Sequence, residues 1–465
     1  MKISFIVMYK PTPLSLCYPS LGVGYLSSYV KQNTDFKTSV IDTAIEDPIN
    51  RLTKERPDII GISSSTLEFH EAIELSKKIK EIFDVPIIVG GSHISALPHT
   101  LQDSFDIGII GEGEQTLVEL LKLFEKYGFS SNKLKNINGI VFHDKNNNKI
   151  TKSRELIRPL DRIPMPDYDL FNMKYYLKKQ DHFPRKHGKG MSMITSRGCP
   201  YRCVFCGSSH FWRMLRYHSA EYSVNVMKFL IDKYDVEFIN IFDDIFVIDI
   251  KRLKEIVKLI REEGIHKKVT FGIQSRANIM SDEICKLLKQ MNVYYLGFGL
   301  ESGSEKILNY LKKGTVTVED NKNAVKMCKK YNFAVGSGFM VGNPNETEKD
   351  MNDTLKFIQE NNMDSCTVYI TAPLPGTELW EYAKKEGLVS DNMDWSKINQ
   401  FFTGDNVILS KMDREKFTMI YNKILRASTV SKIRSNILHP FSLTSYFIKN
   451  PFAIIKYLKQ IRKGG

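Results

Sequence analysis

Two series of short apolar runs, each run followed by a stretch of helical periodicity, constrain the fold of this 465-residue chain more than any other feature. In the first series the runs include DIIGISSST, PIIVGGSH and DIGIIGEGEQ, and helices are expected over residues 49–56 and from Gln115. Runs that stay apolar throughout are typical of parallel strands buried on both faces of a sheet. The first series therefore predicts a doubly wound, Rossmann-like α/β domain over residues 1–130.

The second series begins at Met191 and contains six such strands: SMITSRG, FINIFDDIF, VTFGIQSRA, YYLGFGLESG, VGSGFMVGNP and CTVYITAPLP. Six parallel strands with returning helices predict a partial (β/α)6 barrel over residues 191–400, with its active residues at the carboxyl ends of the strands. Residues 131–190 separate the two series and contain a polar-turned hairpin, NINGIVFHDKNNNKITK, and a proline-punctuated linker, RPLDRIPMPDYDLF.

Composition is that of a globular protein, with 42% hydrophobic and 26% charged residues, and no apolar run is long enough to span a membrane. The apolar run in MKISFIVMYKP is too short for a signal peptide, so we expect a cytoplasmic protein. Of the net charge of +13, most lies in residues 416–465, which hold ten Lys and Arg and no Asp or Glu. Because the rest of the chain is nearly neutral, no nucleic-acid-binding surface is expected.

The basic C-terminal region, residues 401–465, is expected to be helical. Its last part, PFAIIKYLKQIRK (residues 451–463), has helical periodicity, with most Lys and Arg on one side and four apolar residues on the other: Phe452, Ile455, Leu458 and Ile461. Such a helix can pack its apolar side on the barrel, or it can rest on an anionic membrane. The sequence leaves both alternatives open, and the second implies peripheral membrane contact.

Three of the seven cysteines form a cluster in GCPYRCVFC, just past the first barrel strand, with the spacing C-x3-C-x2-C. Together with His210, Cys199, Cys203 and Cys206 could form a closed zinc site. A redox pair would use only Cys203 and Cys206 and leave Cys199 unexplained. A 4Fe–4S cluster held by three thiolates would keep one iron open for a substrate or cofactor, which explains why the motif stops at three.

The loop GCPYRCVFC and the six strand–helix units after it resemble the C-x3-C-x-aromatic-C signature and the barrel of the radical S-adenosylmethionine (SAM) enzymes. The resemblance implies a 4Fe–4S cluster on Cys199, Cys203 and Cys206, with SAM on the open iron. It also implies that reduction of the cluster cleaves SAM to a 5′-deoxyadenosyl radical. In this family Phe205, between the last two cysteines, would contact the adenine of SAM.

Further residues at the ends of the barrel strands match SAM-binding positions of that family. By this resemblance, Asp243 and Asp244 in FDDIF orient the amino group of SAM. Arg276 in QSRA pairs with its carboxylate, a task suited to the guanidinium fork, and Glu301 in LESGS holds the ribose hydroxyls. GFMVGNPNET resembles the glycine-rich motif of the fifth strand, but its spacing to Glu346 is one residue longer, so Glu346 is assigned no role.

In the first domain, IGISSST, IIVGGSHISALP and IGEGEQTLVEL, in that order, resemble the cobalamin-binding domain fused to one branch of the same family. A long nucleotide tail can slot between strand ends only where side chains are small. The residues that the resemblance assigns to cobalamin are Ser63, Ser64, Ser65, Gly90, Gly91, His93, Gly111 and Gly113. The alternative is a doubly wound domain that binds no ligand.

Many cobalamin proteins carry a D-x-H-x-x-G motif whose His replaces the lower ligand of cobalt. The motif is absent from this sequence, so we expect cobalt without a protein His below it.

The resemblance implies a cobalamin-dependent radical SAM enzyme, with methylation of an unactivated carbon as its expected reaction. Relatives that carry out oxidative cyclisation or rearrangement leave a second reaction open, and a non-catalytic zinc or ligand-binding sensor is the alternative from another class. The enzyme would need 4Fe–4S, SAM and cobalamin, an electron donor such as flavodoxin or ferredoxin, and a substrate that the sequence does not identify.

Overall fold

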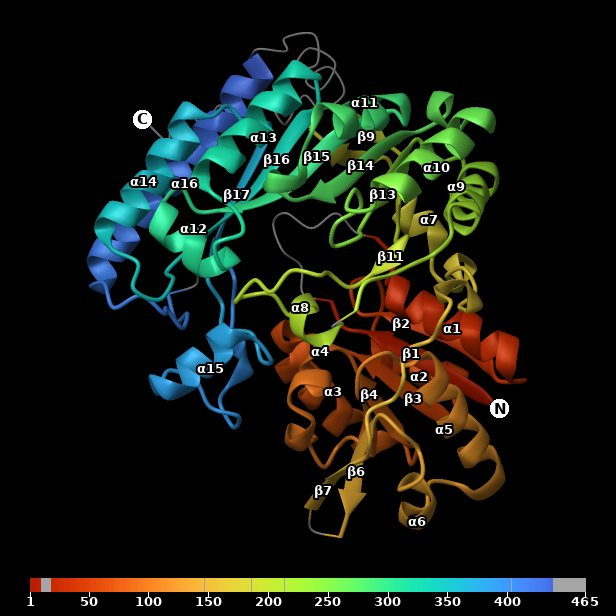
Figure 1. The fold of residues 1–465 in the computed structure, drawn as a ribbon. Coiled ribbons are helices and arrows are strands. Elements are labelled where there is room, and N and C mark those ends of the chain that lie inside the picture. Colours follow the sequence, from red (N-terminus) through yellow and green to blue (C-terminus); the bar gives the residue numbers. More distant parts are fainter. Residues whose placement is uncertain (10–17, 146, 185, 213, 403, 438–465) are drawn as a thin grey trace.

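The computed structural model of the protein describes residues 1–9, 18–145, 147–184, 186–212, 214–402 and 404–437. Two largely parallel sheets with their own helices follow one another along the chain, and Figure 1 shows the first domain in red and orange beside the green and cyan barrel. Within this part of the chain, no helix is long and apolar enough to cross a membrane. The predicted α/β class and the order of the two domains are confirmed.

The first sheet has the order β2-β1-β3-β4-β5-β6-β7, and its first five strands are parallel. These strands are β1 (Lys2–Val7), β2 (Lys37–Asp42), β3 (Ile59–Ser63), β4 (Ile87–Gly90) and β5 (Ile107–Ile109). The helices are α1 (Leu21–Asn33), α2 (Pro48–Glu55), α3 (Phe69–Ile82), α4 (Ser92–Ala96) and α5 (Glu114–Tyr127). Helices α1 and α5 cover one face, and α2 and α3 cover the other. The strand order reverses between β1 and β3, where such sheets open a crevice for a ligand.

The predicted hairpin consists of β6 (Ile140–Asp144) and β7 (Asn147–Ile150), preceded by α6 (Ser131–Leu134). Because β6 pairs antiparallel with β5, the hairpin extends the first sheet rather than standing between the domains. Its residues Ile140, Val141 and Phe142 are buried in the two cores of the first domain. The first domain therefore reaches Ile150 and does not end at residue 130, because a hairpin's sequence does not show whether its edge pairs with another strand.

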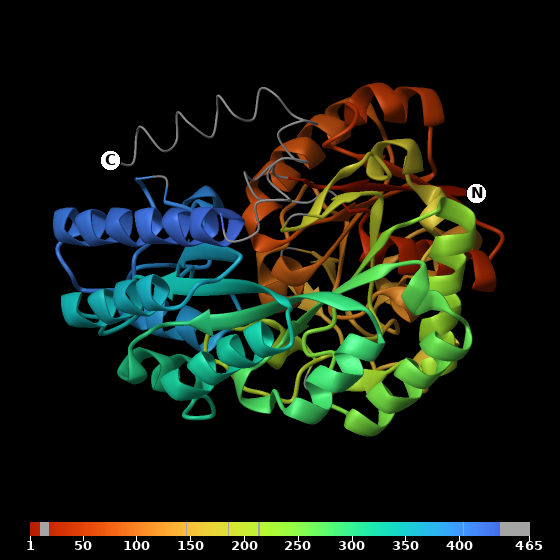
Figure 2. The same ribbon diagram turned by 90° about the horizontal axis from the view of Figure 1, so that it is seen from above.

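All six predicted barrel strands are present, in the order β10-β13-β14-β15-β16-β17, and all pairs are parallel. They are β10 (Gly190–Met193), β13 (Phe238–Ile241), β14 (Thr270–Ser275), β15 (Val293–Glu301), β16 (Ala334–Val341) and β17 (Ser365–Ile370). The helices are α9 (Ala220–Tyr234), α10 (Ile250–Glu262), α11 (Asp282–Gln290), α12 (Glu305–Lys312), α13 (Val318–Lys330) and α14 (Glu348–Glu360). Figure 2 shows them along the outer side of the curved sheet. Thr317 and Thr347 start α13 and α14 with capping boxes, which satisfy the first free backbone N–H groups.

Short elements close the barrel at its start. They are α7 (Met173–Tyr176), the hairpin of β8 (Gln180–Phe183) and β9 (Lys186–Gly188), the hairpin of β11 (Ser196–Arg197) and β12 (Arg216–Tyr217), and α8 (Ser208–Phe211). The ring of Phe183 stacks on Tyr295 of β15, with centroids 5.5 Å apart, and fills the space over Gly272 of β14. The β8–β9 hairpin thereby plugs one end of the barrel.

After β17 the chain continues through α15 (Glu378–Lys385) to α16 (Arg414–Ile437), the helix predicted for the start of the basic region. Phe417, Ile420 and Ile424 of α16 are buried in the core shared with the barrel, and α16 packs on α14 and β17. Its Lys and Arg side chains between residues 416 and 434 are exposed. The predicted amphipathic segment, residues 451–463, lies outside the described residues.

The segment after the barrel also returns to the first domain. Trp395 and Trp380 are buried, and their rings stack with centroids 5.6 Å apart. Trp395 meets the edge of His93 from the first domain, which in turn stacks on Phe69 at 3.7 Å. The apolar core beside α2 and α3 therefore extends to residues 372–409 and joins the first domain to the segment after the barrel.

Replacing Trp395 by Ala should lower the free energy of unfolding by about 3–5 kcal/mol, because it removes a large buried ring that joins two parts of the core. Denaturant unfolding measures the change. Leu388→Ala is the matched control, since Leu388 is 41% exposed, and it should change stability by less than about 0.5 kcal/mol. Equal effects of the two substitutions would contradict the prediction.

Candidate active site between the two sheets

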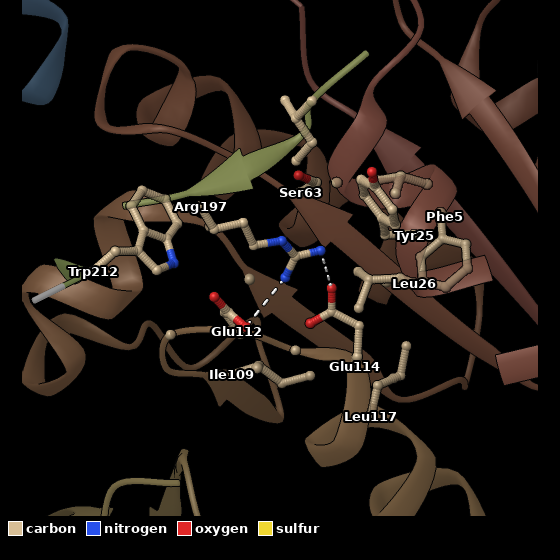
Figure 3. A pocket seen from close by; sticks show the side chains of 18 of the residues that line it. Phe5, Tyr25, Leu26, Ser63, Ile109, Glu112, Glu114, Leu117, Arg197 and Trp212 are labelled. Atoms are coloured by element: carbon tan, nitrogen blue, oxygen red, sulfur yellow. Dashed lines mark hydrogen bonds and ion pairs between the residues drawn. The ribbon is translucent and has the colours of Figure 1, made fainter. Parts of the chain in front are cut away.

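A cavity of about 340 Å³ lies where the carboxyl ends of the first sheet's strands face the start of the barrel (Figure 3). The first domain contributes five of the residues predicted to contact cobalamin: Ser63, Gly90, Gly91, Gly111 and Gly113. From the barrel side come Arg197, Gly198, Trp212, Phe242 and Asp244. The inner end is apolar and includes Phe5, Leu26 and Leu117. The cavity is thus shared by the two domains and lies beside the strand-order reversal.

The glycines of the first domain keep this cavity open. Gly91 has φ +119°, and a Cβ atom there would lie 2.1 Å from the carbonyl oxygen of Ser64, so no other residue fits without a shift. At Gly90 and Gly111 a Cβ atom would meet no atom within 4 Å, and it would extend into open space. These strand ends form a cradle of bare backbone, which fits the large, flat cofactor that the sequence motifs imply.

Three other predicted cobalamin residues do not line the cavity. Ser65 accepts a hydrogen bond from the backbone N–H of Leu67, and the hydroxyl of Ser64 donates to the carbonyl of Ser65, so both serines shape the loop after β3. His93 is fully buried, with Nδ1 3.3 Å from Thr66 Oγ1 and Nε2 3.3 Å from Thr100 Oγ1. Burial lowers the pKa of His93 to about 3, so the ring is neutral. The structure gives His93 a place in the core instead of the predicted contact.

The three clustered cysteines lie in one loop directly after β11. Gly198 starts this loop with φ +93°, and a Cβ atom there would lie 2.6 Å from the carbonyl oxygen of Met214. Backbone hydrogen bonds from Val204 to Leu311 and from Leu379 to Val204 hold the loop against α12 and α15. The conformation of the loop is therefore set by its surroundings.

The thiols are suited to binding a positively charged metal centre. Cys199 and Cys203 are buried, and burial raises the pKa of the Cys199 thiol to about 11, so a thiolate there needs a nearby positive centre such as iron. Among the described residues, no three Cys, His, Asp or Glu side chains are grouped closely enough for one metal ion. A 4Fe–4S cube binds each thiolate through a different iron and so spaces its ligands more widely. The side chain of His210, the fourth ligand of the zinc alternative, lies outside the described part.

Arg276 stands beside this loop. Its Nη1 lies 3.3 Å from the sulfur of Cys203, its Nη2 donates to the hydroxyl of Thr315, and its guanidinium lies 3.8 Å from the centroid of the Tyr201 ring. The side chain is buried, and no carboxylate partner is found for it among the described residues. A buried guanidinium without a carboxylate partner fits the predicted contact with the carboxylate of SAM.

Glu301 and Phe205 line a second cavity of about 410 Å³ inside the barrel, beside the cysteine loop. Glu301 ends β15 at φ +62°, a conformation rare for residues other than glycine, where the register of β15 shifts against β16. Its Oε1 accepts a hydrogen bond from Nζ of Lys312 at 2.9 Å, and this ammonium lies 5.2 Å from the centroid of the Phe205 ring. Lys312 was not predicted, because in LKKG nothing distinguishes this buried lysine from the exposed Lys313 beside it.

The two adjacent aspartates have different surroundings. Asp243 is fully buried and accepts hydrogen bonds of 2.6 Å from the hydroxyls of Thr195 and Ser196, so it joins the end of β13 to the segment before the cysteine loop. Asp244 lines the cavity between the sheets. Burial raises the pKa of Asp244, and a hydrogen bond from Ser208 opposes this shift. Of the pair, only Asp244 lines that cavity, where a ligand could reach it.

Glu346, which has no role assigned from its motif, is a buried residue that shapes its loop. One carboxylate oxygen accepts hydrogen bonds from the backbone N–H groups of Gly342 and Asn343, the latter at 3.0 Å. Burial raises the pKa of this carboxyl to about 7. Asn345, directly before Glu346, has φ 56°, so the loop makes a left-handed turn there.

Comparison with known proteins agrees with this geometry. Residues 193–358 match the radical SAM superfamily, and residues 13–121 match the B12 binding domain. An uncharacterized methyltransferase of Pyrococcus horikoshii is 33% identical, over 87% of this chain and 88% of that protein. The anaerobic magnesium-protoporphyrin IX monomethyl ester cyclase of Rubrivivax gelatinosus is 26% identical, over 78% of this chain and 66% of the cyclase. The radical SAM methyltransferase TsrM from Kitasatospora setae, solved with cobalamin and a 4Fe–4S cluster, has a TM-score of 0.70 and 16% identity, over 92% of this chain and 88% of TsrM.

The chain belongs to the radical SAM superfamily, in the branch that carries an N-terminal B12-binding domain. It is an enzyme whose cofactors are a 4Fe–4S cluster, SAM and cobalamin. This assignment decides between the interpretations of the three cysteines in favour of the cluster and removes the basis for the zinc sensor. The roles of individual residues toward each cofactor stay predictions.

Replacing any one of Cys199, Cys203 or Cys206 by Ala should abolish formation of 5′-deoxyadenosine from SAM and leave cobalamin bound, because the cobalamin loops belong to the other domain. Anaerobic assay of 5′-deoxyadenosine together with the cobalamin absorbance measures both properties. Cys285→Ala is the control, since Cys285 is a buried core cysteine of α11 and should keep full turnover. Full 5′-deoxyadenosine formation in any of the three variants would refute the cluster assignment.

Arg276→Ala and Glu301→Ala should each weaken SAM binding by about 1.5–3 kcal/mol, at least roughly tenfold in Kd, because each removes a charge-assisted hydrogen bond. Iron content should stay at the wild-type value, since neither residue is a cluster ligand. Calorimetric titration with SAM under anaerobic conditions gives the Kd, and Arg261→Ala on the exposed side of α10 is the control. Unchanged SAM affinity in both variants would mean that the SAM pocket lies elsewhere.

Proposed function

We propose that this enzyme transfers a methyl group to an unactivated carbon of its substrate. One observation supports the proposal most: a single cavity is lined both by the glycine loops of the B12-binding domain and by Gly198, the residue before Cys199. A reaction that needs both cofactors at one substrate requires their loops to face the same space. A barrel that used SAM alone would have no need of the first domain's strand ends at its entrance.

When bound, the reduced cluster supplies the electron that cleaves SAM, and cobalamin carries the methyl group. In the proposed overall reaction, one SAM is cleaved to methionine and a 5′-deoxyadenosyl radical, which takes one hydrogen from the substrate carbon and becomes 5′-deoxyadenosine. The carbon gains a methyl group from a second SAM, which leaves as S-adenosylhomocysteine. Electrons from a low-potential protein donor, such as flavodoxin or ferredoxin, balance the reaction. Such a donor is part of the proposal, and no residue of the described surface identifies it.

The chain's own residues bind and orient the reactants in this scheme. Cys199, Cys203 and Cys206 hold the cluster, and Arg276 binds the carboxylate of SAM next to Cys203. Asp244 accepts a hydrogen bond from the amino group of SAM. In the barrel cavity, Glu301 accepts hydrogen bonds from the ribose, and Lys312 holds that carboxylate in place.

Label transfer tests the proposed reaction. The anaerobically purified enzyme, loaded with cobalamin and a reductant, is incubated with SAM deuterated in its methyl group and with extract from cells that lack this gene. We expect one metabolite to gain a labelled methyl group and 5′-deoxyadenosine to form with it, whereas the Cys199→Ala enzyme produces neither. Formation of 5′-deoxyadenosine with no labelled product would argue against methyl transfer.

Oxidative cyclisation is the second candidate, and the similarity to the cyclase of Rubrivivax gelatinosus favours it. The same experiment separates the two reactions. A cyclase would yield a product that has lost hydrogen and carries no label from SAM, whereas a methyltransferase adds one methylene unit to the mass of its substrate.

For the location of the protein, we propose the cytoplasm. Outside the cysteine loop, Cys285, Cys328 and Cys366 are free thiols, as is usual in a reducing compartment. Contact with an anionic membrane through residues 451–463 is kept as an additional proposal, supported by the fifty-residue stretch without an acidic side chain.

The membrane proposal predicts that the full chain sediments with anionic liposomes at low salt and that a chain ending at Asn450 does not, because the deletion removes the apolar side and four of the basic residues. High salt should release the full chain. Neutral liposomes serve as the control. If the two chains sediment alike, the segment packs on the protein or is solvated.

A further inference from the structure

Four charged residues with largely buried side chains form an interdomain charge cluster at the wall of the cavity: Glu112, Glu114, Arg197 and Arg216. Nη1 of Arg197 lies 3.2 Å from Oε2 of Glu112, and its Nη2 donates a 2.7 Å hydrogen bond to Oε1 of Glu114. Figure 3 shows the guanidinium between the two carboxylates. With two arginines and two glutamates, the cluster has no net charge.

The cluster joins the two loops that matter for the proposed reaction. Glu112 lies between Gly111 and Gly113 in the cobalamin loop after β5, and Glu114 begins α5. Arg197 ends β11 only two residues before Cys199. In sequence the two loops are far apart, and each side of the contact belongs to a different domain. The ion pairs therefore tie the predicted cobalamin loop directly to the predicted cluster loop.

The contact is directional as well as charged. The guanidinium of Arg197 uses different nitrogens for the two carboxylates and lies 4.9 Å from the centroid of the Tyr25 ring. Arg216, opposite Arg197 in the β11–β12 pair, donates to the other oxygen of Glu112, and its Nη1 donates to the carbonyl of Ile157 at 3.0 Å. A planar guanidinium that contacts a carboxylate on each side fixes the orientation of the two loops, which a single ammonium group could not do.

A shift of the Arg197 backbone would also move the cysteine loop that follows it. Gly198, the residue between Arg197 and Cys199, is fixed in a left-handed conformation against the carbonyl of Met214. We propose that the interdomain charge cluster sets the separation and orientation of the cluster loop relative to the cobalamin loop. Arg197 is thus a positioning residue for the two-cofactor reaction, although it need not touch either reacting group.

The test measures the coupling between the two cofactors and needs no substrate. The full-length enzyme is loaded with hydroxocobalamin and a reconstituted cluster, and is then reduced so that cobalt and cluster each carry an unpaired electron. Their magnetic interaction falls steeply with distance and broadens the electron paramagnetic resonance signal of cobalt. The Cys199→Ala enzyme, which lacks the cluster, gives the reference signal without coupling.

Two variants remove the contact of the Arg197 guanidinium with both carboxylates in different ways. Arg197→Lys keeps the positive charge but cannot hold both carboxylates in one plane. The double variant Arg197→Met with Glu114→Gln removes one cation and one anion, so the charges of Arg216 and Glu112 still balance and no buried charge is left alone. The matched control is Arg154→Met with Glu119→Gln, an ion pair between α5 and the segment just after β7 whose Nη1–Oε1 distance is 2.8 Å.

We expect the two Arg197 variants to contain as much iron and cobalamin as the wild type and to lose the broadening, while the control pair keeps it. Because the inference assumes that both cofactors bind as proposed above, a wild type that binds no cobalamin or no cluster would overturn the proposed function and the inference together. Fully loaded variants with wild-type broadening would overturn the inference alone. Loss of either cofactor from both variants would also overturn the inference. The charge cluster would then be needed to bind that cofactor or to stabilise the fold, and not to set the distance between the two cofactors.

Discussion

Parallel strands all end at the same edge of a sheet, and in this protein two such edges are turned toward one cavity. Everything at the candidate site depends on this arrangement. The loops after β3, β4 and β5 reach the cavity from one side, and the loop after β11 reaches it from the other. Within each domain, tight turns at this edge require bare backbone in place of side chains. Gly91 and Gly198 occupy positions where a Cβ atom would collide with a neighbouring carbonyl group.

The buried charged residues of the site are of two kinds: pairs of opposite charge, and a single cation that can bind an anionic ligand. Arg197 and Arg216 are neutralised by Glu112 and Glu114, and Glu301 is neutralised by Lys312. These pairs are complete without a cofactor. Arg276 differs, since among the described side chains it has hydrogen bonds to Asn278, Thr315 and Cys203 but no carboxylate. A buried cation of this kind is stable only with an anion nearby, and both a thiolate-bound cluster and the carboxylate of SAM can supply one.

The relative position of the domains is held at two separate places. Near the cavity, the interdomain charge cluster joins the loop after β5 to β11 and β12. Farther along the chain, Trp380 and Trp395 return to pack beside His93 and α3 of the first domain. The apolar contact stabilises the arrangement but does not fix the orientation of the domains, whereas the hydrogen-bonded ion pairs do fix it. Together they explain how the two domains, whose apolar cores are continuous, can present one shared cavity.

The six barrel strands, the parallel first sheet, the cysteine loop and the glycines of the cavity can be predicted from the amino-acid sequence, because strand periodicity, motif spacing and the need for bare backbone are local properties. Four features became known only from the folded chain: β6 extends the first sheet, His93 is a core residue, Asp243 joins two strand ends while Asp244 faces the cavity, and Lys312 is buried beside Glu301. Each of these depends on a partner distant in sequence or on which of two adjacent side chains turns inward. A long-range contact leaves no periodic signal in the chain, so such partners become visible only once the fold brings them together.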